Sequence, residues 1–120
     1  MRYEVMTLED SELLTGILSE MRRGTLTLAV LSRLKAPCYG YALLTQLEEK
    51  HTGIEAGTLY PLLRRLESQG LLESRWDTAE SRPRKYYLLS ARGLTLYEAL
   101  KTDWARLCEE MAALLKEDGP

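Results

Sequence analysis

The sequence predicts a mostly α-helical fold that carries one small β-hairpin, and two patterns lead to this α+β assignment. Apolar residues recur at helical spacing before Gly70 and again after Ser90, whereas residues 71–76 and 84–89 follow a strand-like period of two. The chain has 120 residues, of which 45% are hydrophobic, and this suits one compact domain with a small core. It has no apolar run long enough for a membrane span and no visible secretory segment, so we expect a cytoplasmic protein without membrane contact.

Three helices are expected in the N-terminal half. Residues 8–17 form a short amphipathic pattern, with Thr7 as N-cap and acidic residues in the first turn. A second helix runs from 20 to 34, and Gly24 bends the chain near its junction with the first helix. A third helix covers residues 40–50. Each of the last two carries leucines on one face and therefore contributes to a common core.

The stretch GTLYPLLRRLESQG, residues 57–70, predicts a fourth helix with an unusual residue near its start. Four leucines share one face of this helix: Leu59, Leu62, Leu63 and Leu66. If Thr58 is the N-cap, Pro61 is the third residue of the helix. A backbone N–H at that position has no partner within the helix, so its absence in proline costs no hydrogen bond. If the helix starts at Glu55 or Ala56, Pro61 removes one backbone hydrogen bond and bends the first turn.

The end of the chain predicts a hairpin followed by one long helix. The two strands are residues 71–76 and 84–89, and Ser90 caps a helix that reaches about Lys116. Short helices followed by a two-stranded hairpin are the layout of a winged helix-turn-helix domain. We therefore divide the chain into an N-terminal helical extension (1–19), a winged helix-turn-helix domain (20–90) and a C-terminal dimerisation helix (91–120).

Exposed polar residues on the helix at 56–69 predict a surface that contacts double-stranded DNA. Tyr60 and Arg64 share the stripe opposite the leucines, and Arg65 lies on a neighbouring exposed stripe. Arginine can donate two hydrogen bonds to guanine or to phosphate, and Thr58 lies in the opening turn that would meet the DNA. The alternative is a solvated helix face whose arginines pair with nearby acidic residues.

Two further segments extend the predicted DNA surface. A basic hairpin tip can lie over a phosphate backbone or enter a minor groove, and this tip carries Arg82, Arg84 and Lys85. The start of the third helix offers backbone N–H groups to a phosphate, next to Tyr39, Gly40 and Tyr41. The alternatives are a polar turn and a helix start with two half-buried tyrosines. The net charge is −2, but residues 57–92 are net positive between acidic neighbours, which would direct a polyanion to this region.

The last helix carries apolar residues at alternating spacings of three and four. They are Tyr97, Leu100, Trp104, Leu107, Met111 and Leu114. A heptad pattern of this length on the terminal helix of a small domain predicts self-association. A symmetric homodimer would hold two DNA-binding helices at a fixed separation. The alternative is that this helix folds back on the N-terminal helices, which would still leave part of the pattern exposed.

Trp104 has two interpretations of its own. A tryptophan at such a position is usually core, but it can also form the wall of an apolar pocket between subunits in which a small, planar aromatic effector stacks. Cys108 and Met111 would line the same pocket. No catalytic, metal or cofactor site is predicted, because His51 has no acid–base partner, Cys38 and Cys108 lack metal-ligand spacing, and no phosphate-binding loop is present.

Several stretches together resemble the PadR family of bacterial transcriptional regulators: YGYALLTQL, GTLYPLLRRLESQGLLES, RPRKYYLLSARG and the tryptophan in KTDWARL. The resemblance covers about residues 20–115. It implies a dimeric winged-helix repressor of a palindromic operator, with the helix matching 56–69 in the major groove and the hairpin matching 71–89 as the wing. It also implies dimerisation through the helix matching 91–116, and in some members a ligand pocket beside Trp104. It favours the earlier start of the helix that contains Pro61, although Glu55 departs from the small residues that the family places there.

Two other functions remain compatible with the sequence. One is a dimeric winged-helix adaptor that binds proteins and not DNA, which the net negative charge supports. The other is a small-molecule carrier or sensor built on a pocket in the dimer, which is compatible with DNA binding by the same chain.

Overall fold

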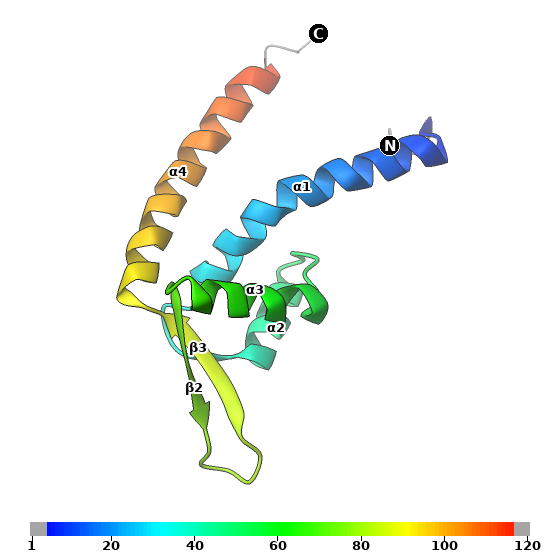
Figure 1. Ribbon diagram of the computed structural model, residues 1–120. Helices are drawn as coiled ribbons and strands as arrows, with labels where there is room; N and C mark the ends of the chain where they lie inside the picture. Colours follow the sequence, from blue (N-terminus) through cyan, green and yellow to red (C-terminus); the bar gives the residue numbers. More distant parts are fainter. Residues whose placement is uncertain (1–4, 117–120) are drawn as a thin grey trace.

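The computed structural model describes residues 5–116 and consists of four helices and a small antiparallel sheet (Figure 1). In chain order the elements are α1 (Leu8–Ser32), β1 (Cys38–Tyr39), α2 (Gly40–Glu49), α3 (Ala56–Ser68), β2 (Leu72–Asp77), β3 (Arg84–Leu89) and α4 (Ala91–Lys116). The predicted fold class is confirmed, with α2 and α3 as the helix-turn-helix and β2–β3 as the wing. Over residues 5–116, no helix combines the length and apolarity that crossing a membrane requires.

The N-terminal region forms one helix, and the prediction of two separate helices over 8–17 and 20–34 is wrong. Thr7 caps α1 as predicted, because its Oγ1 accepts a hydrogen bond of 3.0 Å from the Asp10 N–H. The helix then continues through Gly24 to Ser32. A glycine inside a helix costs only about 1 kcal/mol, and without a proline this is too little to break a helix of this length.

The sheet has three strands in the order β1-β3-β2, whereas the sequence predicted only the β2–β3 hairpin. Both pairings are antiparallel, and β1 contributes two residues that face Tyr86 and Tyr87 of β3. A two-residue strand has no periodicity to detect, so β1 could not be recognised from the sequence. Its effect is to fix the start of α2 against the base of the wing.

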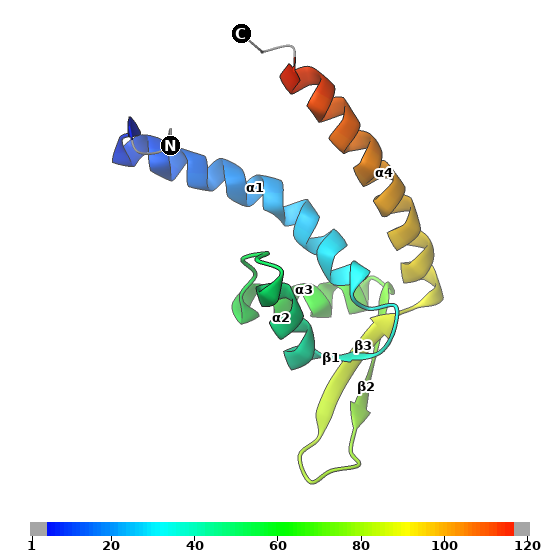
Figure 2. The same cartoon turned by 180° about the vertical axis from the view of Figure 1, so that it is seen from behind.

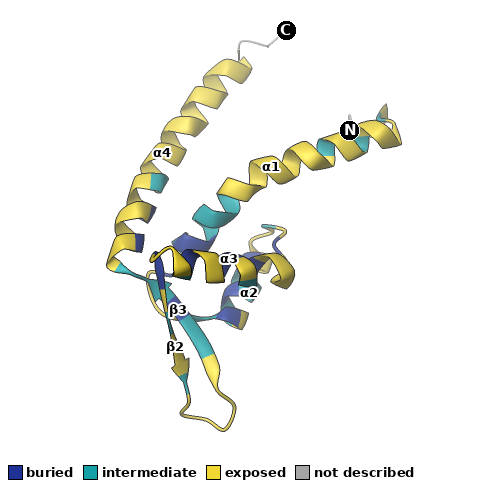
Figure 3. Cartoon of the chain, viewed as in Figure 1, coloured by how far each residue is buried: buried dark blue, intermediate teal, exposed yellow. Residues whose placement is uncertain are grey.

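The core lies between the C-terminal part of α1, the pair α2–α3 and the base of the sheet (Figure 3). Its buried apolar residues are Val30, Leu31, Leu34, Leu43, Leu47, Ile54, Leu59, Leu62, Leu63, Leu66, Leu71, Leu72, Tyr87 and Tyr97. Full burial of one leucine stabilises a fold by about 1.5–3 kcal/mol, so the four leucines of α3 fix its orientation. The N-terminal part of α1 and most of α4 lie outside this core and are exposed.

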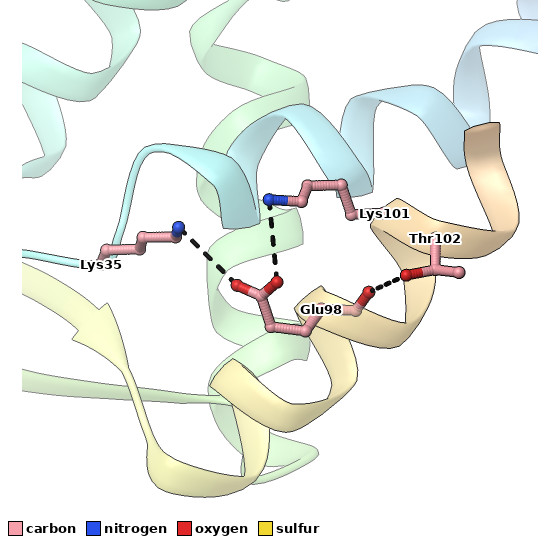
Figure 4. A network of polar contacts seen from close by, with 4 residues as sticks. All are labelled: Lys35, Glu98, Lys101 and Thr102. Carbon is pink, nitrogen blue, oxygen red and sulfur yellow. Dashed lines mark hydrogen bonds and ion pairs between the residues drawn. The ribbon is translucent and has the colours of Figure 1, made fainter.

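The start of α4 is anchored to the domain by its cap and by a small polar network. Ser90 caps the helix as predicted, since its Oγ accepts the Gly93 N–H at 2.9 Å. About two turns further, the Glu98 carboxylate lies 3.7 Å from the ammonium groups of both Lys35 and Lys101 (Figure 4). Beyond this anchor α4 diverges from α1, and the two helices occupy the end of the molecule opposite the wing (Figures 1 and 2).

Candidate nucleic-acid interface

Helix α3 presents one buried face and one charged exposed face. Its four predicted leucines are buried, and Thr58, Arg64 and Arg65 are exposed. The helix begins at Ala56, so the earlier of the two predicted starts is confirmed and Pro61 lies inside the helix. The carbonyl of Gly57 therefore lacks its usual N–H partner four residues later. The N-cap is Glu55, whose side chain makes no capping hydrogen bond, so the first turn of α3 has no side-chain cap.

Tyr60 does not lie on the exposed stripe with Arg64, contrary to the prediction. It is half-buried and packs against the core, with its ring over the start of α2. A Cβ atom on Gly40 would be only 2.9 Å from Tyr60 Cε1, so this glycine is what admits the ring. The two predicted residues therefore form one contact between α2 and α3, and their role toward DNA remains a prediction.

Tyr39 connects the start of α2 to the wing. Its hydroxyl donates a 2.5 Å hydrogen bond to Asp77 Oδ2 at the end of β2, and the Arg84 guanidinium lies 4.3 Å from its ring centroid. This hydrogen bond is the main cause that raises the pKa of Tyr39 and lowers the pKa of Asp77. This hydrogen bond is therefore kept over a wide range of pH. It is lost when the pH falls far enough to protonate Asp77, whose pKa is lowered, or rises far enough to ionise Tyr39, whose pKa is raised. The Tyr39 hydroxyl is thus directed to the wing and not to the N–H groups of α2.

Glu67 connects the wing to helix α3. Its Oε2 accepts a hydrogen bond from the Ser74 hydroxyl of β2, and its Oε1 lies 3.6 Å from the Lys85 ammonium of β3. At the hairpin tip Arg84 lies 3.9 Å from Glu80, while Arg82 is exposed. The wing cations that the sequence predicts to contact DNA are therefore partly neutralised in the unbound protein.

A hollow of about 610 Å³ lies between the start of α2, α3 and the wing. It is lined by Tyr39, Gly40, Tyr41, Ala42, Tyr60, Trp76, Arg82, Pro83, Arg84, Lys85 and Tyr87. The structure thus brings together seven predicted DNA-binding residues from three segments, and leaves Thr58, Arg64 and Arg65 outside the lining. Such a combination of cations and aromatic rings suits a sugar-phosphate backbone.

Trp76 is the residue of this hollow that the sequence reasoning did not select. Its side chain is 63% exposed on the wing, and it pairs in register with Lys85, whose ammonium lies 5.9 Å from the indole centroid. A tryptophan this exposed on a strand is unusual, because burial of its ring is favourable. The signal was present in the sequence, since Trp76 stands at the end of β2 next to the basic hairpin tip, but its exposure depends on the tertiary fold.

A second hollow lies at the other end of the molecule, between α1 and α4. This groove measures about 880 Å³ and is lined by Leu18, Met21, Arg22, Thr25, Leu26, Ala29, Thr52, Trp104, Leu107, Cys108, Met111 and Leu115. The predicted heptad residues divide into two groups: Tyr97 is buried in the chain's own core and Leu100 packs against it, whereas Trp104, Leu107, Met111 and Leu114 are exposed. In the single chain Trp104 is therefore not part of the core, and its assignment to a seam core or to a pocket between subunits remains a prediction. Within residues 5–116, no cluster of three His, Cys, Asp or Glu side chains is placed to hold a metal ion.

The fold and the basic surface define a winged-helix DNA-binding regulator of transcription. Residues 27–101 match the transcriptional regulator PadR-like family, and the chain belongs to this family. A search of curated proteins finds no match. As a member of this family the chain is a regulator that binds DNA and is not an enzyme.

Solved structures of other PadR-family proteins are similar over most of the chain. A PadR family transcriptional regulator from Eggerthella lenta is 46% identical, with a TM-score of 0.82 over 91% of this chain and 97% of that one. A PadR-like transcription factor from Bacteroides fragilis is 33% identical, with a TM-score of 0.71 over 82% and 98%. A PadR-like regulator from Bacillus cereus is 30% identical, with a TM-score of 0.72 over 80% and 96%.

Proposed function

We propose that this protein is a homodimeric repressor that binds a palindromic operator through α3 and the wing. The observation that carries the proposal is the position of Arg64 and Arg65, exposed on α3 beside a wing whose tip carries three further cations, Arg82, Arg84 and Lys85. In this arrangement α3 enters the major groove and the wing follows the flanking phosphate backbone. A repressor of this kind works by occupying its operator, and it would act in the cytoplasm, where bacterial DNA lies.

The homodimer is supported by the apolar faces of α1 and α4, which the single chain leaves uncovered. Apart from Leu94, which lies on another face of α4, the exposed large apolar side chains on these helices are Leu8, Leu13, Ile17, Leu18, Met21, Leu96, Trp104, Leu107, Met111, Leu114 and Leu115. Exposed apolar surface of this extent marks an association site, and a symmetric pair of chains would cover it with the same surface from the partner. We assign dimerisation to residues 91–120, the DNA-binding domain to 20–90, and the N-terminal extension to 1–19.

Release of the repressor by a small aromatic ligand is the second part of the proposal. The three residues that the sequence suggested for an effector pocket between subunits, Trp104, Cys108 and Met111, line the groove between α1 and α4. A planar ring could stack on the indole of Trp104 there, and its affinity would depend on whether the partner chain closes the groove. Quenching of Trp104 fluorescence by planar aromatic compounds, measured in a Trp76→Phe background, tests this part.

DNA binding is tested by fluorescence anisotropy on DNA upstream of the protein's own gene. We expect salt-dependent binding that weakens about tenfold or more in Arg64→Ala and in Arg84→Ala. Arg106→Ala is the matched control, because Arg106 is exposed on α4 and pairs only locally with Asp103 at 3.3 Å. Salt-independent or absent binding, unchanged by the first two substitutions, would favour the adaptor function instead.

The dimer is tested by sedimentation of two variants that place one charge on different faces of α4. Leu107→Glu should convert the dimer to a monomer, since it puts a carboxylate into the proposed interface. Leu94→Glu is the control: Leu94 is 44% exposed against 49% for Leu107, and the two lie about 140° apart around the helix. Equal effects of the two substitutions would contradict the proposed interface.

A further inference from the structure

One arginine of α1 reaches the turn between the two helices of the DNA-binding motif. The Arg22 guanidinium donates a hydrogen bond of 2.8 Å from Nη1 to the backbone carbonyl of Thr52, thirty positions further along the chain. The same nitrogen would lie 3.1 Å from a Cβ atom on Gly53, so the guanidinium lies close against the backbone of the turn. This contact joins the long N-terminal helix to the segment that sets the angle between α2 and α3.

The turn itself has a special backbone geometry. His51 and Gly53 have φ angles of 59° and 76°, and the left-handed conformation is unfavourable for a residue with a side chain such as His51. On its inner side the turn is fixed, because the Thr52 N–H and hydroxyl both donate to the Leu47 carbonyl, at 3.2 and 2.9 Å, and Ile54 is buried. Arg22 holds the outer side, so its hydrogen bond helps to keep an unfavourable conformation in place.

Arg22 also belongs to the groove between α1 and α4. Both Arg22 and Thr52 line this groove together with Trp104 and Leu107. The hydrogen bond to the turn is therefore formed at the wall of the cavity that the proposed dimer closes. Whatever occupies the groove changes the surroundings of the guanidinium, and through it the turn that precedes α3.

We propose that Arg22 is a positioning residue that couples occupation of this groove by a second copy of the chain to the placement of the recognition helix α3. The proposal rests on the proposed function, because it presupposes the dimer and DNA binding. With the partner seated in the groove, Arg22 is confined and the turn is held; without it, the exposed Arg22 side chain leaves the carbonyl more often. Dimerisation then increases the affinity for DNA, and DNA binding increases the affinity between the two chains. The two effects must be equal, because both equilibria depend on the same turn.

The direct test compares Arg22→Ala, Arg22→Lys and the control Arg23→Ala, which removes the next arginine of the same helix. Hydrogen exchange of the amides at 52–55 reports the turn, and anisotropy reports the dissociation constant for DNA. In Arg22→Ala we expect exchange of these amides to become about tenfold faster and DNA binding about threefold to tenfold weaker, while the thermal midpoint falls by no more than about 5 °C. Arg22→Lys should restore part of both effects, because its ammonium can still donate. Wild-type exchange in Arg22→Ala, or an equal change in Arg23→Ala, would overturn the proposal.

The coupling is tested by combining Arg22→Ala with the dimer-breaking Leu107→Glu. In the wild-type background Leu107→Glu should accelerate exchange at 52–55, whereas in the Arg22→Ala background it should add little, since the link is already lost. Equal acceleration in both backgrounds would show that Arg22 does not transmit occupation of the groove. If the wild-type protein binds no DNA, the proposed function fails, while the exchange measurements still decide the role of Arg22 at the turn.

Discussion

Gly93 offers the strongest test of how α4 is seated on the DNA-binding domain. It is buried in the first turn of α4, and a Cβ atom at this position would lie 2.0 Å from the carbonyl oxygen of Leu71 and 2.9 Å from its carbonyl carbon. Ordinary contacts of a Cβ begin at about 3.4 Å, so Gly93→Ala requires a shift of more than 1 Å. The obstacle is backbone that is itself fixed, because the Leu71 carbonyl accepts the Ser90 N–H at 3.0 Å and the Leu71 N–H donates to Leu66.

We expect Gly93→Ala to lower the free energy of unfolding by about 3 kcal/mol, the upper end for overpacking, because the neighbouring backbone cannot rotate away as a side chain can. For a chain of this size this lowers the thermal midpoint by roughly 12 °C. Thermal unfolding followed by circular dichroism, at one protein concentration, measures it. Gly16→Ala is the matched control: it lies in α1 with nothing within 4 Å, so alanine should stabilise by about 1 kcal/mol. A midpoint for Gly93→Ala within about 3 °C of wild type would refute the reasoning.

Three smaller predictions concern the DNA-binding surface. In Gly40→Ala the three atoms nearest the new Cβ all belong to the end of the Tyr60 side chain, the closest at 2.9 Å, and this side chain can rotate. The substitution should therefore lower the free energy of unfolding by less than about 1 kcal/mol, yet weaken DNA binding severalfold because the ring turns into the hollow. A loss of stability as large as that of Gly93→Ala would contradict this. Glu67→Gln keeps an acceptor for the Ser74 hydroxyl of the wing but removes the negative charge that pairs with Lys85. The nonspecific affinity for DNA at low salt should therefore rise about two- to fivefold, and the slope of log affinity against log salt concentration should become steeper by about one. An unchanged slope would count against this prediction. Glu55→Ser supplies the missing cap of α3 and should raise the thermal midpoint by about 4 °C, whereas Glu55→Ala should not.

The sequence predicted the fold correctly wherever a pattern of apolar residues repeated over several turns of a helix or several residues of a strand. The spacing of the leucines in α3 identified its buried face, and the change of period after Gly70 identified the wing, because both signals are local and repeat several times. The N-terminal helix was misjudged for the opposite reason. Gly24 suggested a bend near the junction of two helices, but one glycine does not prevent the helical backbone from continuing, and α1 remains one helix.

The sequence predicted which residues belong to the candidate site, but it did not predict the hydrogen bonds and ion pairs that connect them. Residue type and face selected the basic residues of the wing and the aromatic residues of α2. The contacts that orient them join residues far apart in the sequence: Tyr39 with Asp77, 38 positions on, and Glu67 with Lys85. No local pattern specifies such pairs, because they depend on how the strands and helices pack. The same reason explains why Trp76 was missed, since only the packed structure shows that its ring remains outside the core.

Two carboxylates that contact the wing, one on α3 and one at the hairpin tip, explain how a chain with net charge −2 can be organised to bind DNA. Arg84 and Lys85 lie 3.9 and 3.6 Å from Glu80 and Glu67, and partly exposed ion pairs of this kind stabilise by at most about 1 kcal/mol. DNA phosphates can displace these carboxylates at small cost, so the pairs hold the wing in position before binding without opposing it strongly. Within residues 5–116, none of the ion pairs involves Arg64, and an arginine without a carboxylate to displace contributes its full electrostatic attraction to phosphate or guanine. Substitution of Arg64 should therefore cost more affinity than substitution of Lys85, although both carry one positive charge.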